Sequence, residues 1–92
     1  MEIEKAKAII EAIFFACGRE VEIKELMSAL EMSSEEILTI IESMKQDYLQ
    51  NERGIEIIKV NDALQLTTKK DYYDYIYILY LIKEANQIYQ MQ

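Results

Sequence analysis

The sequence predicts a mainly helical domain with a small β-hairpin wing, the winged helix-turn-helix class. Three observations predict this class. A first segment with helical spacing of apolar residues is followed by two short-linked amphipathic segments. A stretch in which apolar residues recur at every second position comes next, and a last segment with helical character follows it. The 92 residues suffice for one domain, and 51% of them are apolar. Because the apolar residues lie in periodic segments, the chain is expected to fold instead of remaining disordered.

The first helix is predicted from Ile3 to Cys17, where apolar residues recur every three or four positions and Gly18 supplies a C-terminal stop. We expect Cys17, which ends this stripe beside Phe14, to pack as a small hydrophobe. A second apolar stripe makes the latter half of the helix apolar almost all round. Its members are Ala8, Ile9, Ala12, Phe15 and Ala16. Because one core contact needs only one stripe, this helix is either central or meets a partner.

Two further helices are predicted to form the helix-turn-helix. The segment 19–22 is long enough for one turn or a stub of strand, and helical spacing resumes at Ile23. A third helix begins near Ser34, because a serine hydroxyl there can accept from a helical amide while Glu36 reaches back to the cap. Its packing side is predicted from the apolar spacing. That side contains Ile37, Ile41, Met44 and Tyr48. The methionines Met27, Met32 and Met44 are interpreted as gap fillers in the core.

The wing is predicted where the spacing of apolar residues changes from the helical period of 3.6 residues to the strand period of two. Residues 55–60 form a β-branched run, Asn61 and Asp62 suit a turn, and residues 64–67 alternate apolar with polar side chains. Two such strands joined by a short turn make a hairpin, and a hairpin after a helix-turn-helix is a wing.

The last segment, residues 69–92, contains no proline or glycine and is predicted to be one long helix. The uninterrupted run from Tyr75 to Ile82 is also compatible with a strand. This segment contains six of the seven tyrosines: Tyr72, Tyr73, Tyr75, Tyr77, Tyr80 and Tyr89.

A helix that is apolar or aromatic all round cannot hide every side chain in one small core, and tyrosine is enriched at protein interfaces. We therefore expect this helix and the second face of the first helix to build a dimer or partner surface. Its candidate residues are Ile9, Ala12, Phe15, Tyr73, Tyr77 and Tyr80. The alternative is that one side completes the core and the other stays exposed.

Residue types that catalysis usually needs are scarce. The chain has no histidine, one cysteine and two glycines, which removes Cys–His or Ser–His pairs, an internal disulfide and a glycine-rich phosphate loop. Neighbouring Glu35 and Glu36 point apart on a helix and cannot act as a carboxylate dyad. The sequence predicts no enzyme, cofactor, metal or small-molecule substrate. It also contains no apolar run of membrane-spanning length and no signal peptide pattern, so a cytoplasmic location without a membrane partner is expected.

The charge balance disfavours nucleic acid as a partner. Ten basic and seventeen acidic side chains give a net charge of −7, which repels a polyphosphate. The predicted third helix carries four acidic residues against Lys45, so sequence-specific DNA binding is not expected. The best basic cluster is Lys59, Lys69 and Lys70, which we interpret as a solvated face. A DNA-binding winged-helix transcriptional regulator remains the alternative function, and a dimerisation module of an unrelated complex is a third.

The order of these segments resembles the N-terminal part of the segregation and condensation protein B (ScpB) family of bacteria. The resemblance covers most of the chain. It is carried by residues 8–15 with Gly18, Val21, residues 23–26, Ala29-Leu30, residues 34–37, residues 53–60, residues 64–69, and Tyr72-Tyr73. The resemblance implies a non-catalytic subunit that forms a homodimer and joins the kleisin ScpA, and through it the SMC ATPase, in chromosome condensation and segregation.

The sequence departs from the family pattern in three places. Glu20 stands where proline is frequent and Glu22 where a serine cap is usual, and both changes are expected to leave the fold intact. The largest departure is length, because the family carries a second winged-helix domain beyond the position where this sequence stops. We accordingly expect residues 1–70 to form the winged-helix domain and residues 71–92 an aromatic helix leading toward that second domain.

Overall fold

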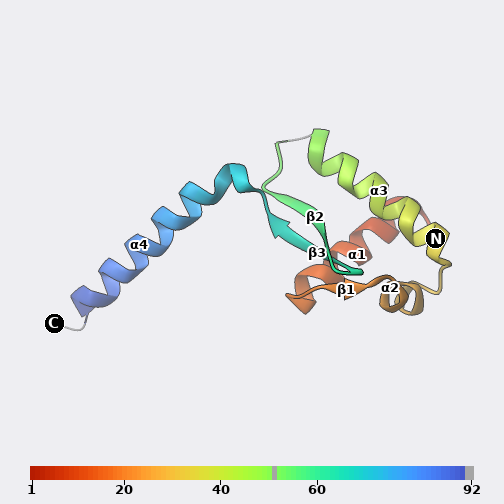
Figure 1. Ribbon diagram of the computed structural model, residues 1–92, viewed down its shortest axis with the longest axis horizontal. Helices are drawn as coiled ribbons and strands as arrows, with labels where there is room; N and C mark the ends of the chain where they lie inside the picture. The colour runs from red at the N-terminus through yellow and green to blue at the C-terminus, as the bar shows by residue number, and fades with distance from the viewer. Residues whose placement is uncertain (51, 91–92) are drawn as a thin grey trace.

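The computed structural model describes residues 1–50 and 52–90, with the side chains of 88–90 left aside (Figure 1). Asn51 lies outside the described residues. The elements, in chain order, are α1 (Ile3–Cys17), β1 (Val21–Glu22), α2 (Ile23–Leu30), α3 (Ser34–Gln50), β2 (Ile55–Val60), β3 (Ala63–Thr68), the 3₁₀ turn η1 (Lys70–Tyr72) and α4 (Tyr73–Gln90). This order is that of a winged helix, as predicted.

The helix ends follow from local hydrogen bonding. Gly18 adopts a left-handed conformation with φ of +62°, and its N–H donates to the Phe14 carbonyl oxygen over 3.2 Å, which closes α1. At the start of α3 the Glu36 N–H donates to Ser33 Oγ over 3.2 Å, and the Ser33 N–H donates to Glu36 Oε1 over 3.3 Å. This reciprocal cap confirms the predicted start of the third helix.

The wing belongs to a three-stranded antiparallel sheet with the order β1-β3-β2. In the hairpin, Ile57 faces Leu66, and in the short pairing with β1, Val21 faces Leu64. The stub of strand allowed by the sequence is therefore β1. The hairpin turn uses Asn61 at φ of +57°, a conformation that asparagine tolerates better than most residues.

The core lies between α1, α2, α3 and one face of the sheet. Its buried side chains are Ala6, Ile10, Phe14, Val21, Leu26, Leu30, Ile37, Ile40, Ile41, Met44, Tyr48, Ile57 and Leu64. The predicted packing side of α3 is confirmed. Met44 is buried, and Met27 and Met32 are partly buried against the core, as expected of gap fillers.

The expectation for Cys17 was wrong, because its side chain is exposed. The buried positions of α1 end at Phe14, and the last turn of the helix before Gly18 contributes no residue to the core. Ile3, the first residue of the predicted apolar stripe of α1, also lies outside the core, since it is 47% exposed. Apolar periodicity predicted the face of the helix correctly but extended it one turn too far at each end.

Helix α4 projects away from the rest of the molecule (Figure 1), which measures 56 × 26 × 25 Å along its principal axes. The radius of gyration is 16.8 Å, against about 12 Å for a compact chain of this length. The segment 75–82 is helical, in agreement with the prediction. Among the described side chains of α4 none is buried, so α4 completes no part of this core.

Candidate protein interface

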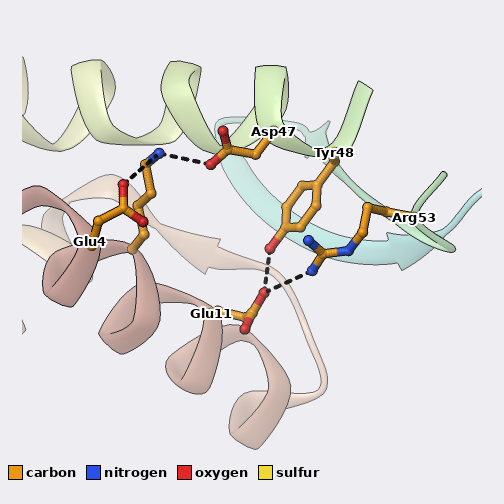
Figure 2. A network of polar contacts seen from close by, with 6 residues as sticks. Glu4, Glu11, Asp47, Tyr48 and Arg53 are labelled. Atoms are coloured by element: carbon orange, nitrogen blue, oxygen red, sulfur yellow. Dashed lines mark hydrogen bonds and ion pairs between the residues drawn. The ribbon is translucent and has the colours of Figure 1, made fainter. Parts of the chain in front are cut away.

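A network of polar contacts fixes α1 against α3 (Figure 2). The Lys7 Nζ donates to Asp47 Oδ2 over 2.7 Å and lies 3.5 Å from Glu4 Oε1. The hydrogen bond with the Asp47 carboxylate raises the pKa of Lys7 above its ordinary value. The partners lie 40 residues apart in the chain, so no local sequence signal predicted their contact.

The second half of the network joins α1 and α3 to the segment before the wing. The Tyr48 hydroxyl donates to Glu11 Oε2 over 2.7 Å, and the Arg53 guanidinium lies 4.0 Å from the same oxygen (Figure 2). Arg53 also stacks over the Tyr48 ring at 5.2 Å from its centroid. Burial, and then the hydrogen bond to Glu11, raise the pKa of Tyr48. These contacts make α1, α3 and the wing one frame on which the exposed apolar surfaces are held.

The second face of α1 is less uniform than its sequence suggests. Ile9 is half-buried and packs against the core, while Ala12 is exposed. Phe15 is 85% exposed and lines a shallow groove of about 240 Å³ between the end of α1 and the hairpin. Apolar walls of this groove come from Ile55 and Leu66. Of the three α1 candidates, Phe15 therefore offers the largest contact surface.

The three α4 candidates lie on one side of that helix. Tyr73, Tyr77 and Tyr80 follow the spacing i, i+4, i+7 and are 48–63% exposed. Ile76, which is half-buried, lies between them. We call Tyr73, Ile76, Tyr77 and Tyr80 the tyrosine stripe. Tyr89 also belongs to the aromatic series of the sequence, but its side chain lies outside the described part.

A second apolar stripe on α4 lies outside the six candidate residues, although the segment was predicted to be apolar or aromatic all round. Tyr75, Ile78, Leu79 and Ile82 have the spacing i, i+3, i+4, i+7 and are 50–72% exposed. At 3.6 residues per turn this set lies roughly opposite the tyrosine stripe. We call it the aliphatic stripe. Its helical spacing is present in the sequence, where this segment is apolar or aromatic all round.

The candidate residues of α1 and α4 do not form one continuous surface in a single chain, because α4 points away from α1 (Figure 1). Hydrogen bonds at the base of α4 hold this direction. The Lys69 N–H donates to the Gly54 carbonyl oxygen over 2.9 Å, and Lys69 Nζ donates to the Tyr48 carbonyl oxygen over 2.6 Å. The structure thus presents two separate apolar surfaces, one on the body and one on α4.

The surface that winged helices use for DNA is acidic here. Glu35, Glu36 and Glu42 are exposed on α3, while Lys45 is half-buried in a groove that also contains Glu56 and Asp71. The wing lysines do not form one patch with a shared role. The Lys69 ammonium group donates a hydrogen bond to the Tyr48 carbonyl oxygen, whereas Lys59 lies on β2 and is exposed.

Within the described residues, no helix combines the length and the apolar content that crossing a membrane demands. The same residues contain no group of three or more acidic or cysteine side chains placed to hold a metal ion.

The element order, the three-stranded sheet and the core define the class of this chain as a winged-helix domain. Comparison with known families identifies it further. Residues 8–92 match the model of the segregation and condensation complex subunit ScpB. The chain belongs to the ScpB family.

Relatives named segregation and condensation protein B support this assignment. The protein of Alkaliphilus oremlandii is 36% identical over 90 residues, which is 98% of this chain and 49% of the relative. The protein of Lachnoclostridium phytofermentans is 42% identical over 76 residues, which is 83% of this chain and 40% of the relative. The chain therefore spans about half the length of the curated relatives that it matches.

Solved structures agree with the fold. A crystal structure of a dimer of the ScpB N-terminal domain complexed with a ScpA peptide superposes with a TM-score of 0.80 at 35% identity, covering 84% of this chain and 96% of that chain. The structure of ScpB from Mycobacterium tuberculosis gives a TM-score of 0.85 at 17% identity, over 91% of this chain and 52% of that chain. The second likeness bears on the fold alone.

Proposed function

We propose that this chain is a non-catalytic, dimerising accessory subunit of the bacterial SMC–ScpA–ScpB complex and supports chromosome condensation and segregation. The observation that carries the proposal is the pair of exposed apolar surfaces, Phe15 on α1 and the stripes of α4, on a body whose third helix is acidic. The exposed apolar side chains of α4 follow one another along the helix, and a contiguous exposed apolar surface marks a site for other proteins.

The partners are a second copy of the chain and the kleisin ScpA. The 35% identical relative was crystallised as a dimer of its N-terminal domain with a ScpA peptide, and this chain aligns with 96% of that domain. Ile9, Ala12, Phe15, Tyr73, Tyr77 and Tyr80 are the residues that we assign to contacts with these partners. Tyrosine suits this role, because its ring supplies apolar area while the hydroxyl stays hydrated.

The described residues carry no cluster suited to catalysis. The sequence has no histidine, and Tyr48, the group with the largest pKa shift, is held in the frame between α1 and α3. We therefore assign no reaction, cofactor or small-molecule substrate to the chain. Its location follows from the complex: cytoplasmic, at the nucleoid through SMC.

Residues 1–70 form the winged-helix domain in this proposal, and α4 leads toward a second domain. The length of the relatives supports this division, since about half of each extends beyond the match. The same division accounts for the absence of buried side chains among the described residues of α4.

Co-purification tests the proposal. An affinity-tagged full-length protein is expressed in the source cells and recovered at moderate salt, and the bound proteins are identified. We expect the kleisin and an SMC protein. Recovery of neither, from cells that contain both, would contradict the assignment to this complex.

Variants distinguish the proposed surface from the rest of the protein. Phe15→Ser and the pair Tyr77→Ala and Tyr80→Ala should reduce recovery of the kleisin. Leu38→Ala is the matched control, because Leu38 is an exposed apolar residue of α3 outside both surfaces. Equal recovery with all variants would remove the six residues from the interface.

A further inference from the structure

Strand β3 has an open edge on the side of β1. The sheet order is β1-β3-β2, and β2 pairs along the whole length of β3. Strand β1 pairs only with Ala63 and Leu64. Within the described part of the chain, residues 65–68 of β3 therefore have no neighbouring strand on that side. Such an edge presents backbone donors and acceptors that a further strand can use.

The register shows which backbone groups point to the open edge. Successive residues of a strand direct their N–H and C=O groups to opposite sides in the sheet. The Lys69 N–H donates to the carbonyl oxygen of Gly54, just before β2, so the odd-numbered residues of β3 bond toward β2. Leu66 and Thr68 therefore point their backbone groups to the open edge. Among the described residues, no backbone hydrogen bond outside the regular helices and strands involves these two.

The open stretch of β3 lacks the features that protect strand edges. Natural edges carry charged side chains or proline, or are covered by another segment. Residues 65–68 have the sequence Gln-Leu-Thr-Thr, without charge or proline, and threonine favours strands. Strand β2 differs, because it carries Glu56 and the exposed Lys59 and packs against α3. Of the two outer edges of the sheet, the β3 edge is therefore the one suited to pairing.

An apolar groove lies beside this edge, where α1 packs against β3 (Figure 1). It holds about 240 Å³ and is lined by residues 65–68, by Ile55 and by the end of α1. Phe14 is buried there, whereas Phe15 is exposed. We call this space the Phe15 groove. A strand added at β3 would direct every second side chain toward it, because successive side chains of a strand point to opposite faces.

We infer that an extended segment of a different polypeptide adds to the sheet as a strand beside residues 65–68 and places apolar side chains in the Phe15 groove. The unpaired backbone groups of Leu66 and Thr68 decide the kind of occupant, since an extended backbone is their complement. In this mode of recognition main-chain hydrogen bonds supply affinity and side-chain pockets supply specificity. The inference rests on the partner contact assigned to Phe15 in the proposed function, and it adds the conformation of the partner.

The added strand runs antiparallel to β3. Antiparallel pairing is the more stable arrangement per residue, and β3 pairs in this way with both β1 and β2. Residues that exchange hydrogen bonds across an antiparallel pair have their side chains on the same face. Leu66 packs against the core and lines the Phe15 groove. The residues bound to Leu66 and Thr68 therefore direct their side chains into the groove, so the segment alternates apolar with polar residues.

A different polypeptide fits the edge better than this chain does. Helix α4 leads the following 18 residues away from the body (Figure 1). A second copy that offered its β2 edge to this β3 edge would make a head-to-tail contact, which does not close into a dimer. The net charge of −7 also favours a segment whose polar residues are neutral or basic.

Hydrogen exchange measured by NMR tests the site with a defined probe. The probe is the peptide acetyl-Lys-Thr-Ile-Thr-Val-Thr-Lys-amide, added to the 92-residue chain. In the free chain the Leu66 and Thr68 amides should exchange fast, whereas those of Gln65 and Thr67, which bond toward β2, should exchange slowly. Saturating peptide should slow exchange at Leu66 and Thr68 by about tenfold or more, because their N–H groups gain acceptors.

Two N-methylated forms of the peptide are the matched controls. Methyl groups on the isoleucine and valine nitrogens remove the N–H groups that face β3, and should weaken binding by about 100-fold. Methyl groups on the two threonines that follow them lie on the outer edge and should change binding by less than about threefold. Equal binding of both forms would overturn strand addition, because apolar contact alone would then account for the binding.

Variants of the chain separate the edge from the groove. Thr68→Pro removes an N–H of the open edge and should weaken binding by about tenfold. Thr68→Val keeps that N–H and should leave binding within about twofold. Phe15→Ala should weaken binding by about tenfold through the groove. Circular dichroism and the exchange of the Gln65 and Thr67 amides check that each variant keeps the fold.

Three further outcomes would overturn the inference. One is the absence of binding to the unmodified chain up to about 5 mM peptide, because main-chain pairing requires little of the sequence. Another is slow exchange of Leu66 and Thr68 in the free chain at low concentration, which would mean that the chain already covers its own edge. Slow exchange that develops as protein concentration rises would assign the edge to a second copy.

These outcomes differ from a failure of the proposed function. Co-purification that recovers the kleisin and an SMC protein, without binding of the peptide, would overturn strand addition and leave the proposed function intact. Peptide binding that meets every control, with neither protein recovered, would retain the strand-addition site and contradict the assignment to the complex.

Discussion

Tyr48 is the residue at which α1, α3 and the segment before the wing meet. Its ring belongs to the core and lies under Arg53, and its hydroxyl donates to Glu11. Its carbonyl oxygen accepts from Lys69 at the base of α4. A single side chain of α3 and its backbone therefore connect the frame to the helix that carries the proposed interface.

The raised pKa of Tyr48 makes stability depend on pH in the alkaline range. The folded state holds the phenol proton to a higher pH than the unfolded state, whose tyrosines titrate near pH 10. Unfolding therefore releases a proton above about pH 10, and the free energy of unfolding should fall there by up to about 1.4 kcal/mol per pH unit from this group. Urea denaturation between pH 8 and pH 11 measures the slope.

The control for this slope is Tyr48→Phe, which keeps the ring and removes the titrating hydroxyl. Its stability at pH 8 should be lower by about 1–2 kcal/mol, because the hydrogen bond to Glu11 is lost. Its decline above pH 10 should be shallower and should reflect Lys7, whose pKa is also raised. Identical slopes for both proteins would contradict the role assigned to the Tyr48 hydroxyl.

Glu31 has a backbone conformation that its side chain disfavours. It follows α2 at φ of +55°, in the left-handed region that glycine usually occupies after a helix. Glu31→Gly should raise the free energy of unfolding by about 0.5–1 kcal/mol, because the strain exceeds the added entropy of the unfolded chain. Thermal and urea denaturation of the two proteins would measure the gain.

Gly18 provides the opposite control. It has φ of +62° after α1, and a Cβ placed there meets no atom within 4 Å. Gly18→Ala should therefore destabilise the protein by about 1 kcal/mol through backbone strain alone. If Glu31→Gly destabilised as well, the left-handed conformation at residue 31 would not be the source of strain.

At the scale of the element, α3 shows how closely burial can change along a helix. Ile37 is fully buried, whereas its neighbour Leu38 is 52% exposed. Ile37→Ala should lower the free energy of unfolding by about 2–5 kcal/mol, since it removes core volume that the neighbours cannot fill. Leu38→Ala should change it by less than about 1 kcal/mol, and urea denaturation compares the two. Similar losses would mean that Leu38 is covered by something in solution.

Element positions were predictable because helical and strand periods are local properties of the sequence. The cap at Ser33 and Glu36, the turn at Asn61 and the stop at Gly18 each depend on residues within a few positions. Contacts between distant positions were not predictable. The bonds Lys7–Asp47 and Tyr48–Glu11 join residues 40 and 37 positions apart, and their partners are ordinary charged residues of solvated helix faces.

The candidate interface was predictable only in part, for a related reason. Excess apolar surface on α4 follows from composition, because more apolar residues are present than one helix face needs. The direction of α4 does not follow from composition, because it depends on the hydrogen bonds of Lys69 with Gly54 and Tyr48. The exposure of Cys17 was missed because the core ends one turn before α1 does.

For the whole molecule, the distribution of charge predicts little affinity for DNA. The net charge is −7, and the exposed face of α3 carries Glu35, Glu36 and Glu42. The Lys69 ammonium group donates a hydrogen bond to the Tyr48 carbonyl oxygen. In about 150 mM salt, fluorescence anisotropy with a labelled duplex should show no saturable binding up to about 10 µM protein. Salt-sensitive binding that weakens on Lys59→Ala and Lys70→Ala would instead favour a DNA-binding regulator.

The separation of α4 from the body predicts that the body folds without it. None of the described side chains of α4 is buried, and the core residues all precede residue 65. A chain of residues 1–70 should keep a cooperative urea transition, with a free energy of unfolding within about 1 kcal/mol of the full chain measured at concentrations where both are monomers. It should remain monomeric in sedimentation experiments at concentrations where the full chain associates. Loss of the cooperative transition would show that α4 contributes to the fold, and persistence of the dimer would place the self-association surface on the body.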